Sequence, residues 1–252
     1  MTDARNTFAK QSGAYAVARP RYPAGLYDWI QSQCERHDSA WDCATGNGQA
    51  AIDLARRFAR VYASDISPEQ VGHGSPAQNI VYSVESAEQT SYPDGEFDLV
   101  AVAQALHWFD YARFWPEVSR VARPGALFCA WGYAWFSCDP EILNEVVLPF
   151  RALIEPFWAA NNRLLWHGYR SEEISFPYKR IETPRFTIEL DWNVPELIAY
   201  MQTWSASKRE AEDDAVGAEL SQLTDSALTR LAGFPRFTVS MPIEMVAGRV
   251  AT

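Results

Sequence analysis

Residues 41–48 have the composition of a ligand-binding turn. An acidic residue, Asp42, closes a short apolar run, and two glycines, Gly46 and Gly48, precede a helix expected over 49–59. Glycine permits positive φ angles and close approach of the backbone to a ligand, and a helix N-terminus carries a partial positive charge. The pattern predicts that a nucleotide-like ligand binds at this turn.

A second acidic residue, Asp65, ends the next apolar run and follows Asp42 by 23 residues. That spacing suits a carboxylate that accepts hydrogen bonds from ribose hydroxyl groups. Gly46, Gly48 and Ala51 also satisfy the dinucleotide pattern G-x-G-x-x-G/A, so the glycines alone do not choose the cofactor. Asp42 favours a ligand with a positively charged amino-acid portion over an anionic pyrophosphate. A sulfonium nucleoside therefore fits better than a dinucleotide.

The turn resembles the first motif of the class I S-adenosylmethionine-dependent methyltransferases, which usually have glycine where this chain has Ala44. Further matches follow in that family's order. They are Asp65-Ile66-Ser67, Ser86-Ala87-Glu88, Phe97-Asp98-Leu99-Val100 and Arg120-Val121-Ala122-Arg123-Pro124-Gly125-Ala126. Five ordered motifs over 40–132 are far more specific than one glycine loop. The resemblance implies an α/β fold with a Rossmann-like seven-stranded sheet and an inserted helical cap.

The same resemblance implies S-adenosyl-L-methionine as the cofactor and assigns residues to it. Asp65 would bind the ribose, Gly46 and Gly48 would allow close approach, and Ser86, Ala87 and Glu88 would border the adenine. The remaining cofactor contacts that it implies are Arg19, Asp42, Ala44, Ile66 and Gln104. Arg19 would pair with the carboxylate of the methionine moiety, or it is a surface arginine before a proline.

A narrower set of segments resembles the trans-aconitate methyltransferase-like branch, whose members methylate carboxylates of small acids. The segments are Tyr15 with Arg19-Pro20-x-Tyr22-Pro23, His107-Trp108-Phe109-Asp110, Trp131-Gly132-Tyr133 and Thr203-Trp204-Ser205-Ala206. The resemblance is weakest over 136–185, the region expected to choose the substrate. Candidate substrate contacts are Trp108, Trp131, Tyr133, Trp158, Arg163, Trp166 and Arg170. The alternative for the aromatic residues of 136–185 is that they pack the insertion onto the sheet.

A carboxylate acceptor suits methyl transfer because an ionised acid needs no deprotonation before it attacks a sulfonium methyl group. Positioning then supplies most of the catalysis. Anion and cation neutralise one another as the methyl moves, so a dry apolar pocket stabilises the transition state. Tryptophan walls and one or two guanidinium groups would provide such a pocket. We therefore expect a small carboxylic acid as substrate and a methyl ester as product.

His107 is the candidate catalytic residue, as a general base. Its alternative role is structural, as a cap of the loop that follows the strand expected at 97–103. Methylation at carbon, oxygen or nitrogen of another small metabolite stays open, and it would make such a base more necessary. A nucleotide-binding protein without catalysis is a further alternative.

Composition favours a single domain over 1–252, with the cap at 136–185, because 252 residues at 48% hydrophobic content can bury one sizeable core. The net charge of −10 argues against nucleic acid as a partner, since phosphate binding requires clustered Lys and Arg.

No signal-peptide core and no membrane-length apolar run appear, so we expect a cytoplasmic protein with no membrane partner. The sequence does not indicate the oligomeric state.

The four cysteines, Cys34, Cys43, Cys129 and Cys138, form no C-x-x-C pair, and two of them lie in apolar runs. This spacing predicts buried reduced thiols rather than disulfides or zinc ligands, and no metal site is expected.

The order of elements that would position these residues follows from the apolar pattern. Apolar runs that alternate with helical patterns are typical of a parallel sheet with crossover helices. Strands are expected near 39–43, 60–64, 79–84, 97–103 and 126–131, and alternating apolar residues predict two more at 186–192 and 237–243. Helices are expected at 194–208 and 215–231, and Ser67-Pro68 predicts the start of a short helix.

Overall fold

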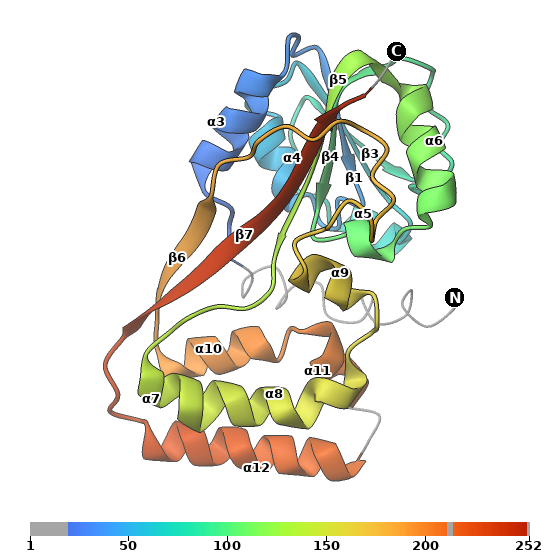
Figure 1. Cartoon of the computed structure of the whole chain (residues 1–252). Helices are drawn as coiled ribbons and strands as arrows, with labels where there is room; N and C mark the ends of the chain where they lie inside the picture. Colours follow the sequence, from blue (N-terminus) through green and yellow to red (C-terminus); the bar gives the residue numbers. More distant parts are fainter. Residues whose placement is uncertain (1–19, 211–213, 251–252) are drawn as a thin grey trace. The chain divides into compact units, whose positions relative to one another are not determined.

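The computed structural model describes residues 20–210 and 214–250. Within them a seven-stranded sheet runs in the order β3-β2-β1-β4-β5-β7-β6 (Figure 1). The strands are β1 (Ser39–Cys43), β2 (Arg60–Asp65), β3 (Ile80–Val84), β4 (Phe97–Ala103), β5 (Ala122–Tyr133), β6 (Phe186–Trp192) and β7 (Phe237–Arg249). Strands β1 to β5 pair in parallel, and β7 is antiparallel to β5. The expected α/β fold class with a Rossmann-like seven-stranded sheet is confirmed.

Two strands are longer than expected because their partners extend the ladder beyond the apolar runs. Strand β5 starts at Ala122, which pairs with Phe97, instead of at 126. Strand β7 continues to Arg249, which pairs with Leu127, instead of ending at 243. Between β1 and β2 the helix α4 (Gln49–Leu54) is shorter than the expected 49–59. The chain leaves it early because the amide of Ala59 already donates to the carbonyl of His37, at the entry to the parallel pairing.

Helices cover both faces of the sheet. Figure 1 shows α3 (Ala24–Gln33) and α4 on one side and α6 (Tyr111–Val121) on the other. Alternate side chains of a strand point to opposite faces, so Trp41 faces the core beneath α6 whereas its neighbour Asp42 faces the side of α3. The short helix α5 (Pro68–Gly72) begins as expected, with Ser67 Oγ accepting a hydrogen bond from the amide of Gln70.

The chain divides into two compact units. Among the described residues, the sheet unit comprises 21–134, 163–186 and 242–250, and the helical unit comprises Pro20, 135–162, 187–210 and 214–241. The region expected as a cap, 136–185, is shared between them, because 136–162 belongs to the helical unit and 163–185 to the sheet unit. No helix of the described residues is long and apolar enough to cross a membrane.

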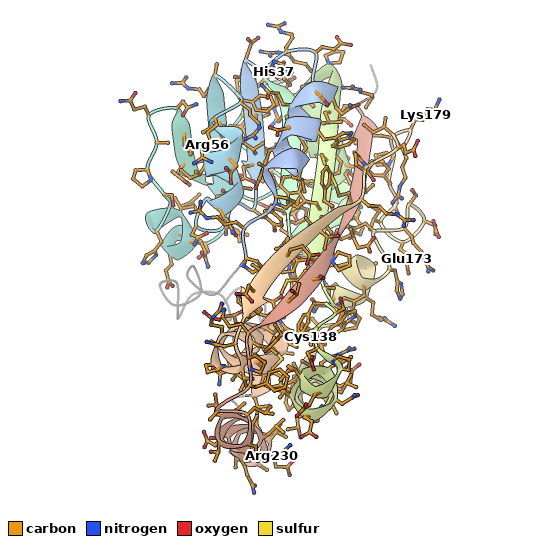
Figure 2. All side chains as sticks on the ribbon, turned by 90° about the vertical axis from the view of Figure 1, so that its left-hand side faces the viewer. His37, Arg56, Cys138, Glu173, Lys179 and Arg230 are labelled. Atoms are coloured by element: carbon orange, nitrogen blue, oxygen red, sulfur yellow. The ribbon has the colours of Figure 1, made fainter. Side chains whose placement is uncertain are left out.

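The helical unit is built from helices that range in length from 3 residues in α7 to 17 residues in α12. They are α7 (Pro140–Ile142), η2 (Leu143–Val147), α8 (Leu148–Ile154), η3 (Glu155–Phe157), α10 (Val194–Met201), α11 (Ser205–Glu210) and α12 (Asp214–Arg230). The expectation of one helix over 194–208 is wrong. The amide of Trp204 makes a turn bond to the carbonyl of Met201, and the Trp204 ring is buried against Phe150. Arg230, which Figure 2 labels, is the last residue of α12 and forms an ion pair with Glu145.

The segment 163–186 adds to the core of the sheet unit. It begins in α9 (Asn162–Trp166) and carries Tyr169, Ile174 and Tyr178, all buried. The indole Nε1 of Trp115, in α6, donates to the carbonyl of Ile174 at 2.9 Å. This segment therefore packs on the α6 side of the sheet instead of standing apart as a flap.

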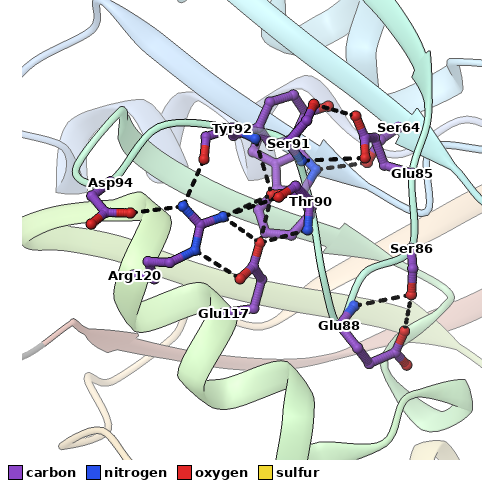
Figure 3. Close-up of polar contacts among 11 residues, drawn as sticks. Ser64, Glu85, Ser86, Glu88, Thr90, Ser91, Tyr92, Asp94, Glu117 and Arg120 are labelled. Atoms are coloured by element: carbon purple, nitrogen blue, oxygen red, sulfur yellow. Dashed lines mark hydrogen bonds and ion pairs between the residues drawn. The ribbon is translucent and has the colours of Figure 1, made fainter.

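A buried carboxylate joins α6 to the loop that follows β3 (Figure 3). Glu117 accepts hydrogen bonds from the amide of Thr90 at 2.7 Å and from its hydroxyl at 2.6 Å. Arg120 donates to both oxygens of Glu117, at 2.9 and 2.7 Å, and to the carbonyl of Tyr92 at 2.7 Å. Burial alone would raise the pKa of Glu117, but the hydrogen bonds from Arg120 and Thr90 outweigh it and lower the pKa. The network ties residues 90–92 of this loop to α6.

We predict that Glu117→Gln lowers the free energy of unfolding by about 1–3 kcal/mol at neutral pH, because charged hydrogen bonds are lost. Since the folded pKa lies below the ordinary value of 4.5, this contribution is full above that value and is lost as the pH falls below it. Urea unfolding between pH 7 and pH 3 measures both effects. The exposed Glu35→Gln is the control, and an equal loss at every pH would contradict the assignment.

Candidate functional site

The turn after β1 is built from backbone conformations that most residues avoid. Ala44, Gly46 and Gly48 have φ angles of 56°, 57° and 84°. The amide of Thr45 donates to the carbonyl of Ser64 in β2 at 2.8 Å, which holds the turn against the neighbouring strand. Ala44 tolerates the left-handed region at a cost of roughly 1–2 kcal/mol, where glycine would have none. The turn therefore keeps the shape of the motif although one glycine is missing.

Gly48 could not be replaced without moving its neighbours. A Cβ at this position would meet the hydroxyl of Tyr82. That hydroxyl donates to the carbonyl of Ser75 at 2.9 Å, so it is itself held in place. The sequence analysis did not identify Tyr82. Its only signal in the sequence was a tyrosine on β3, a strand that β2 separates from β1 in the sheet.

Asp65 stands at the end of β2 and braces the turns that follow both strands. Its Oδ2 accepts a hydrogen bond from the amide of Gly46, and its Oδ1 accepts one from the amide of Ser67, each at 2.9 Å. Burial raises the pKa of Asp65, and the two amides partly offset this. Ile66, the next residue, is exposed. Asp42, Gly46, Gly48 and Asp65 thus meet at the carboxyl ends of β1 and β2.

Asp42 is fully buried and its carboxylate is only half satisfied. Thr45 Oγ1 donates to Asp42 Oδ2 at 2.5 Å. Oδ1 is shielded from solvent and accepts no hydrogen bond from the residues that the structure describes. Burial raises the pKa of Asp42 to about 7, and the Thr45 hydroxyl and the backbone amide of Ala51 offset only part of that rise. An ionised carboxylate here would be stabilised by a cationic ligand group.

The segment expected to border an adenine lies in the loop after β3. Ser86 Oγ donates to Glu88 Oε2 at 2.5 Å (Figure 3). Ala87, between them in the sequence, is buried. The other oxygen of Glu88 accepts a hydrogen bond from the amide of Asp110 at 3.2 Å. The Glu117 network described above orients this loop. Glu117 could not be found from the sequence, because its partner Thr90 is 27 residues away.

Aromatic rings meet at the carboxyl end of β5. Trp131 is buried and contacts Tyr22 and Tyr27 edge to face, with ring centroids 5.8 and 6.0 Å apart. Tyr22 also contacts Tyr133, at 5.9 Å. Gln104, at the end of β4, has a φ of 57°, and its Nε2 donates to the carbonyl of Tyr133 at 2.9 Å. These residues form an apolar wall on the face of the sheet to which Asp42 belongs.

His107 lies in the short helix η1 (Leu106–Trp108) and is buried. Its Nδ1 is 3.0 Å from the hydroxyl of Tyr169, which is buried as well. Tyr169 has a φ of 51°, and its carbonyl accepts a hydrogen bond from Arg180. A nonglycine residue in this region is held by its surroundings. Sequence reasoning missed Tyr169 as the partner of His107 because 62 residues separate the two.

The structure places the candidate substrate residues in both units. Trp108, Trp131, Tyr133, Arg163, Trp166 and Arg170 belong to the sheet unit, whereas Trp158 belongs to the helical unit. Arg163 and Arg170 are exposed, and Trp108, Trp158 and Trp166 are half-buried. Arg19 lies outside the described residues. The described residues contain no group of three or more His, Cys, Asp or Glu side chains able to hold a metal ion. All four cysteines are free, and Cys43 and Cys129 are buried as expected.

Comparisons with known proteins agree with this geometry. The family model "Methyltransferase domain" matches residues 41–130. A protein of Dictyostelium discoideum named "Putative methyltransferase" is 30% identical over 205 residues, which cover 79% of this chain and 76% of that protein. An uncharacterized methyltransferase of Mycobacterium tuberculosis is 35% identical over 147 residues, or 56% of this chain and 58% of that protein.

A solved structure from Anaeromyxobacter dehalogenans, described as a "Putative Type II Methyltransferase", is 35% identical and superimposes with a TM-score of 0.79. The match covers 92% of this chain and 98% of that chain. The sheet order, the glycine turn with its two acidic residues and these relatives lead to one assignment. The chain belongs to the class I S-adenosylmethionine-dependent methyltransferases.

Proposed function

We propose that this methyltransferase transfers the methyl group of S-adenosylmethionine to a carboxylate of a small organic acid, as members of the trans-aconitate methyltransferase-like branch do. The observation that carries the proposal is the burial of His107 against Tyr169. The candidate base is thereby buried, with its Nδ1 beside a hydroxyl of the protein itself. A carboxylate acceptor needs no base, because it is already ionised at neutral pH.

The residues around the glycine turn fit the cofactor. The buried Oδ1 of Asp42, which no described residue satisfies, suits the ammonium group of the methionine moiety. Each carboxylate oxygen has two lone pairs, so Asp65 can accept from ribose hydroxyls while it holds the amides of Gly46 and Ser67. Ala87 is suited to contact the adenine. The remaining proposed contacts are Ala44, Gly48, Ile66, Ser86, Glu88, Gln104 and Arg19, the last outside the described residues.

The cofactor, when bound, supplies a methyl group on positively charged sulfur. The protein's part is to orient the acid and to exclude water. Trp131, Tyr22 and Tyr133 give an apolar wall in which opposite charges attract more strongly than in water. Charge is lost as the methyl moves, so this environment favours the transition state over the separated ions. No residue has to take up a proton in this reaction.

Our first functional prediction concerns the pH dependence of cofactor binding. Because the pKa of Asp42 is about 7, affinity for S-adenosylhomocysteine should rise by about tenfold between pH 5.5 and pH 7 as the carboxylate ionises. The amino group of the ligand stays protonated over this range, since α-amino groups have a pKa of about 7.7–8.0. Calorimetric titration at several pH values measures the effect.

The matched variant is Asp42→Asn, which should bind weakly at every pH. The effect of Asp42 on the stability of the unliganded protein depends on pH in the opposite direction to its effect on cofactor affinity. A folded pKa above the ordinary 3.8 stabilises the unliganded protein only at low pH, and this contribution is lost as the pH rises through 7. Asp42→Asn should therefore melt no lower than the wild type at pH 8. Affinity of the wild type that does not change with pH would contradict the proposed role of Asp42.

The second prediction concerns the product. Incubation with methyl-labelled S-adenosylmethionine and a panel of small di- and tricarboxylic acids should give a methyl ester. Esters release their label as volatile methanol in mild alkali, so the released counts identify the bond. The corresponding amides serve as controls because they offer no carboxylate. Label that is stable to alkali would instead favour methylation at carbon, oxygen or nitrogen of another small metabolite.

The third prediction separates a structural His107 from a catalytic one. His107→Asn keeps a polar group near the Tyr169 hydroxyl and should retain turnover within about tenfold, whereas loss of a general base costs roughly 10²–10⁴-fold. Tyr169→Phe, which removes only the hydrogen bond to His107, should also retain most of the turnover. Turnover against pH is measured for all three proteins. A large loss in a folded, cofactor-binding His107→Asn protein, with a wild-type rate that climbs near the imidazole pKa, would overturn the base-free reaction.

A further inference from the structure

Three buried polar atoms on one side of the sheet have no hydrogen-bond partner in the described part of the chain. They are the hydroxyl of Tyr27 in α3, Oδ1 of Asp42 in β1 and the indole Nε1 of Trp131 in β5. All three side chains are buried, lie on the side of the sheet that α3 covers and belong to the sheet unit. The proposed ammonium contact accounts for Asp42 and leaves Tyr27 and Trp131 unexplained.

Two buried residues of the same types in this unit show the usual arrangement. The indole Nε1 of Trp115 donates to the carbonyl of Ile174 at 2.9 Å. The Tyr178 hydroxyl lies 3.0 Å from that of Ser119. Buried tyrosine hydroxyls and tryptophan N–H groups normally have such partners, because an unpaired one loses its hydrogen bonds to water without replacement. A bound group would explain the exception on the α3 side.

Tyr27 and Trp131 are neighbours. Their rings meet edge to face, with centroids 6.0 Å apart and an interplanar angle of 88°. The ring of Tyr22 contacts both, at 6.5 Å from Tyr27 and 5.8 Å from Trp131. The hydroxyl and the N–H group thus belong to one aromatic cluster, where water competes little for a hydrogen bond.

Both unpaired groups are neutral donors. An indole N–H can only donate. Burial, together with the nearby carboxylates of Asp53 and Asp42, raises the pKa of Tyr27 well above its ordinary value of 10.0, so its hydroxyl stays protonated and can donate as well. The two groups therefore suit an acceptor, and a carboxylate is the strongest acceptor among the groups that the proposed reaction brings in.

The order of the strands indicates which ligand supplies this carboxylate. The proposed contacts to adenine, ribose and ammonium follow β3, β2 and β1 in turn, whereas β5 lies on the other side of β1, beyond β4. Ala101 of β4 pairs with both Asp42 and Cys129, and Trp131 is one side-chain layer closer than Cys129 to the carboxyl edge. A ligand at Trp131 is therefore on the side of Asp42 away from the adenine, which fits a methyl acceptor better than any part of the nucleoside.

We infer that the Tyr27 hydroxyl and the Trp131 indole N–H bind the carboxylate that is methylated. This inference rests on the proposed function. Carboxylate oxygens have more lone pairs than two donors occupy, so one stays free for attack. An oxygen of the carboxylate forms a bond to the methyl carbon as the carbon–sulfur bond breaks, the electron pair stays on sulfur, and no proton moves. Neutral donors orient the carboxylate without cancelling its charge, as a guanidinium would, so it stays nucleophilic.

The test removes the hydroxyl alone, in Tyr27→Phe. The acid of the panel that the wild type esterifies best is the substrate, and the same acid with an amide at the methylated position is the probe. Calorimetric titration in the presence of S-adenosylhomocysteine gives Kd without turnover. Tyr27→Phe should raise Kd and KM for the acid by about 10- to 100-fold, the effect of losing a hydrogen bond to a charged group. Kd for the amide, a neutral acceptor, should rise by about fivefold or less.

Melting temperature provides a second readout, and Tyr178→Phe is the matched control. Tyr27→Phe removes an unpaired buried hydroxyl and should not lower the melting temperature of the unliganded protein. Tyr178→Phe breaks the contact with Ser119, so it should melt lower and keep the wild-type Kd and KM. Trp131→Phe removes the N–H group and, where the melt shows it folded, should weaken binding of the acid as Tyr27→Phe does.

The affinity of Tyr27→Phe for S-adenosylhomocysteine should stay near the wild-type value. A loss of affinity for S-adenosylhomocysteine instead of for the acid would assign the hydroxyl to the cofactor and overturn this inference alone. An equal loss for acid and amide, or an unchanged Kd for the acid in a folded Tyr27→Phe protein, would do the same. A wild type that binds the cofactor but esterifies no acid would overturn the proposed function itself.

Discussion

Asp42 keeps a carboxylate fully buried at the carboxyl end of β1, and this burial constrains the whole glycine turn. Water cannot reach its Oδ1, and only the other oxygen has a side-chain partner among the described residues, the hydroxyl of Thr45. The backbone of the turn passes close to this carboxylate, and Ala44, Gly46 and Gly48 adopt left-handed conformations there. Asp65 holds that backbone in place through the amide of Gly46. Two acidic residues and one strained turn thus depend on each other.

Local patterns were enough to predict the sheet and this turn. Strand positions followed from apolar runs, and the spacing of Asp42 and Asp65 placed both at neighbouring strand ends. The strain at Ala44 was not visible, because alanine carries no signal for positive φ. The early end of the helix after Gly48 was also hidden, since strand pairing between distant residues decides it. The helix propensity of one segment contains no information about which distant segment it will form hydrogen bonds with.

The partners of the site residues escaped prediction for the same reason. Glu117 is an ordinary helical glutamate in sequence, and only its contacts with Thr90 and Arg120 show that it ties α6 to the loop after β3. Tyr169 looked like one of many aromatic residues in the expected cap, yet it lies in the sheet unit beside His107. Two arginines of the expected cap, Arg163 and Arg170, were candidate substrate contacts because of their place in the sequence, and both side chains are exposed.

The central claim is that the unsatisfied oxygen of Asp42 receives the cationic end of the cofactor. A crystal structure of the complex with S-adenosylhomocysteine tests this most directly. The account predicts the ligand's ammonium group within hydrogen-bond distance of Asp42 Oδ1, its ribose hydroxyls on Asp65 and its adenine beside Ala87. A complex in which the ligand lies elsewhere, or in which Asp42 Oδ1 still has no partner, would contradict the account.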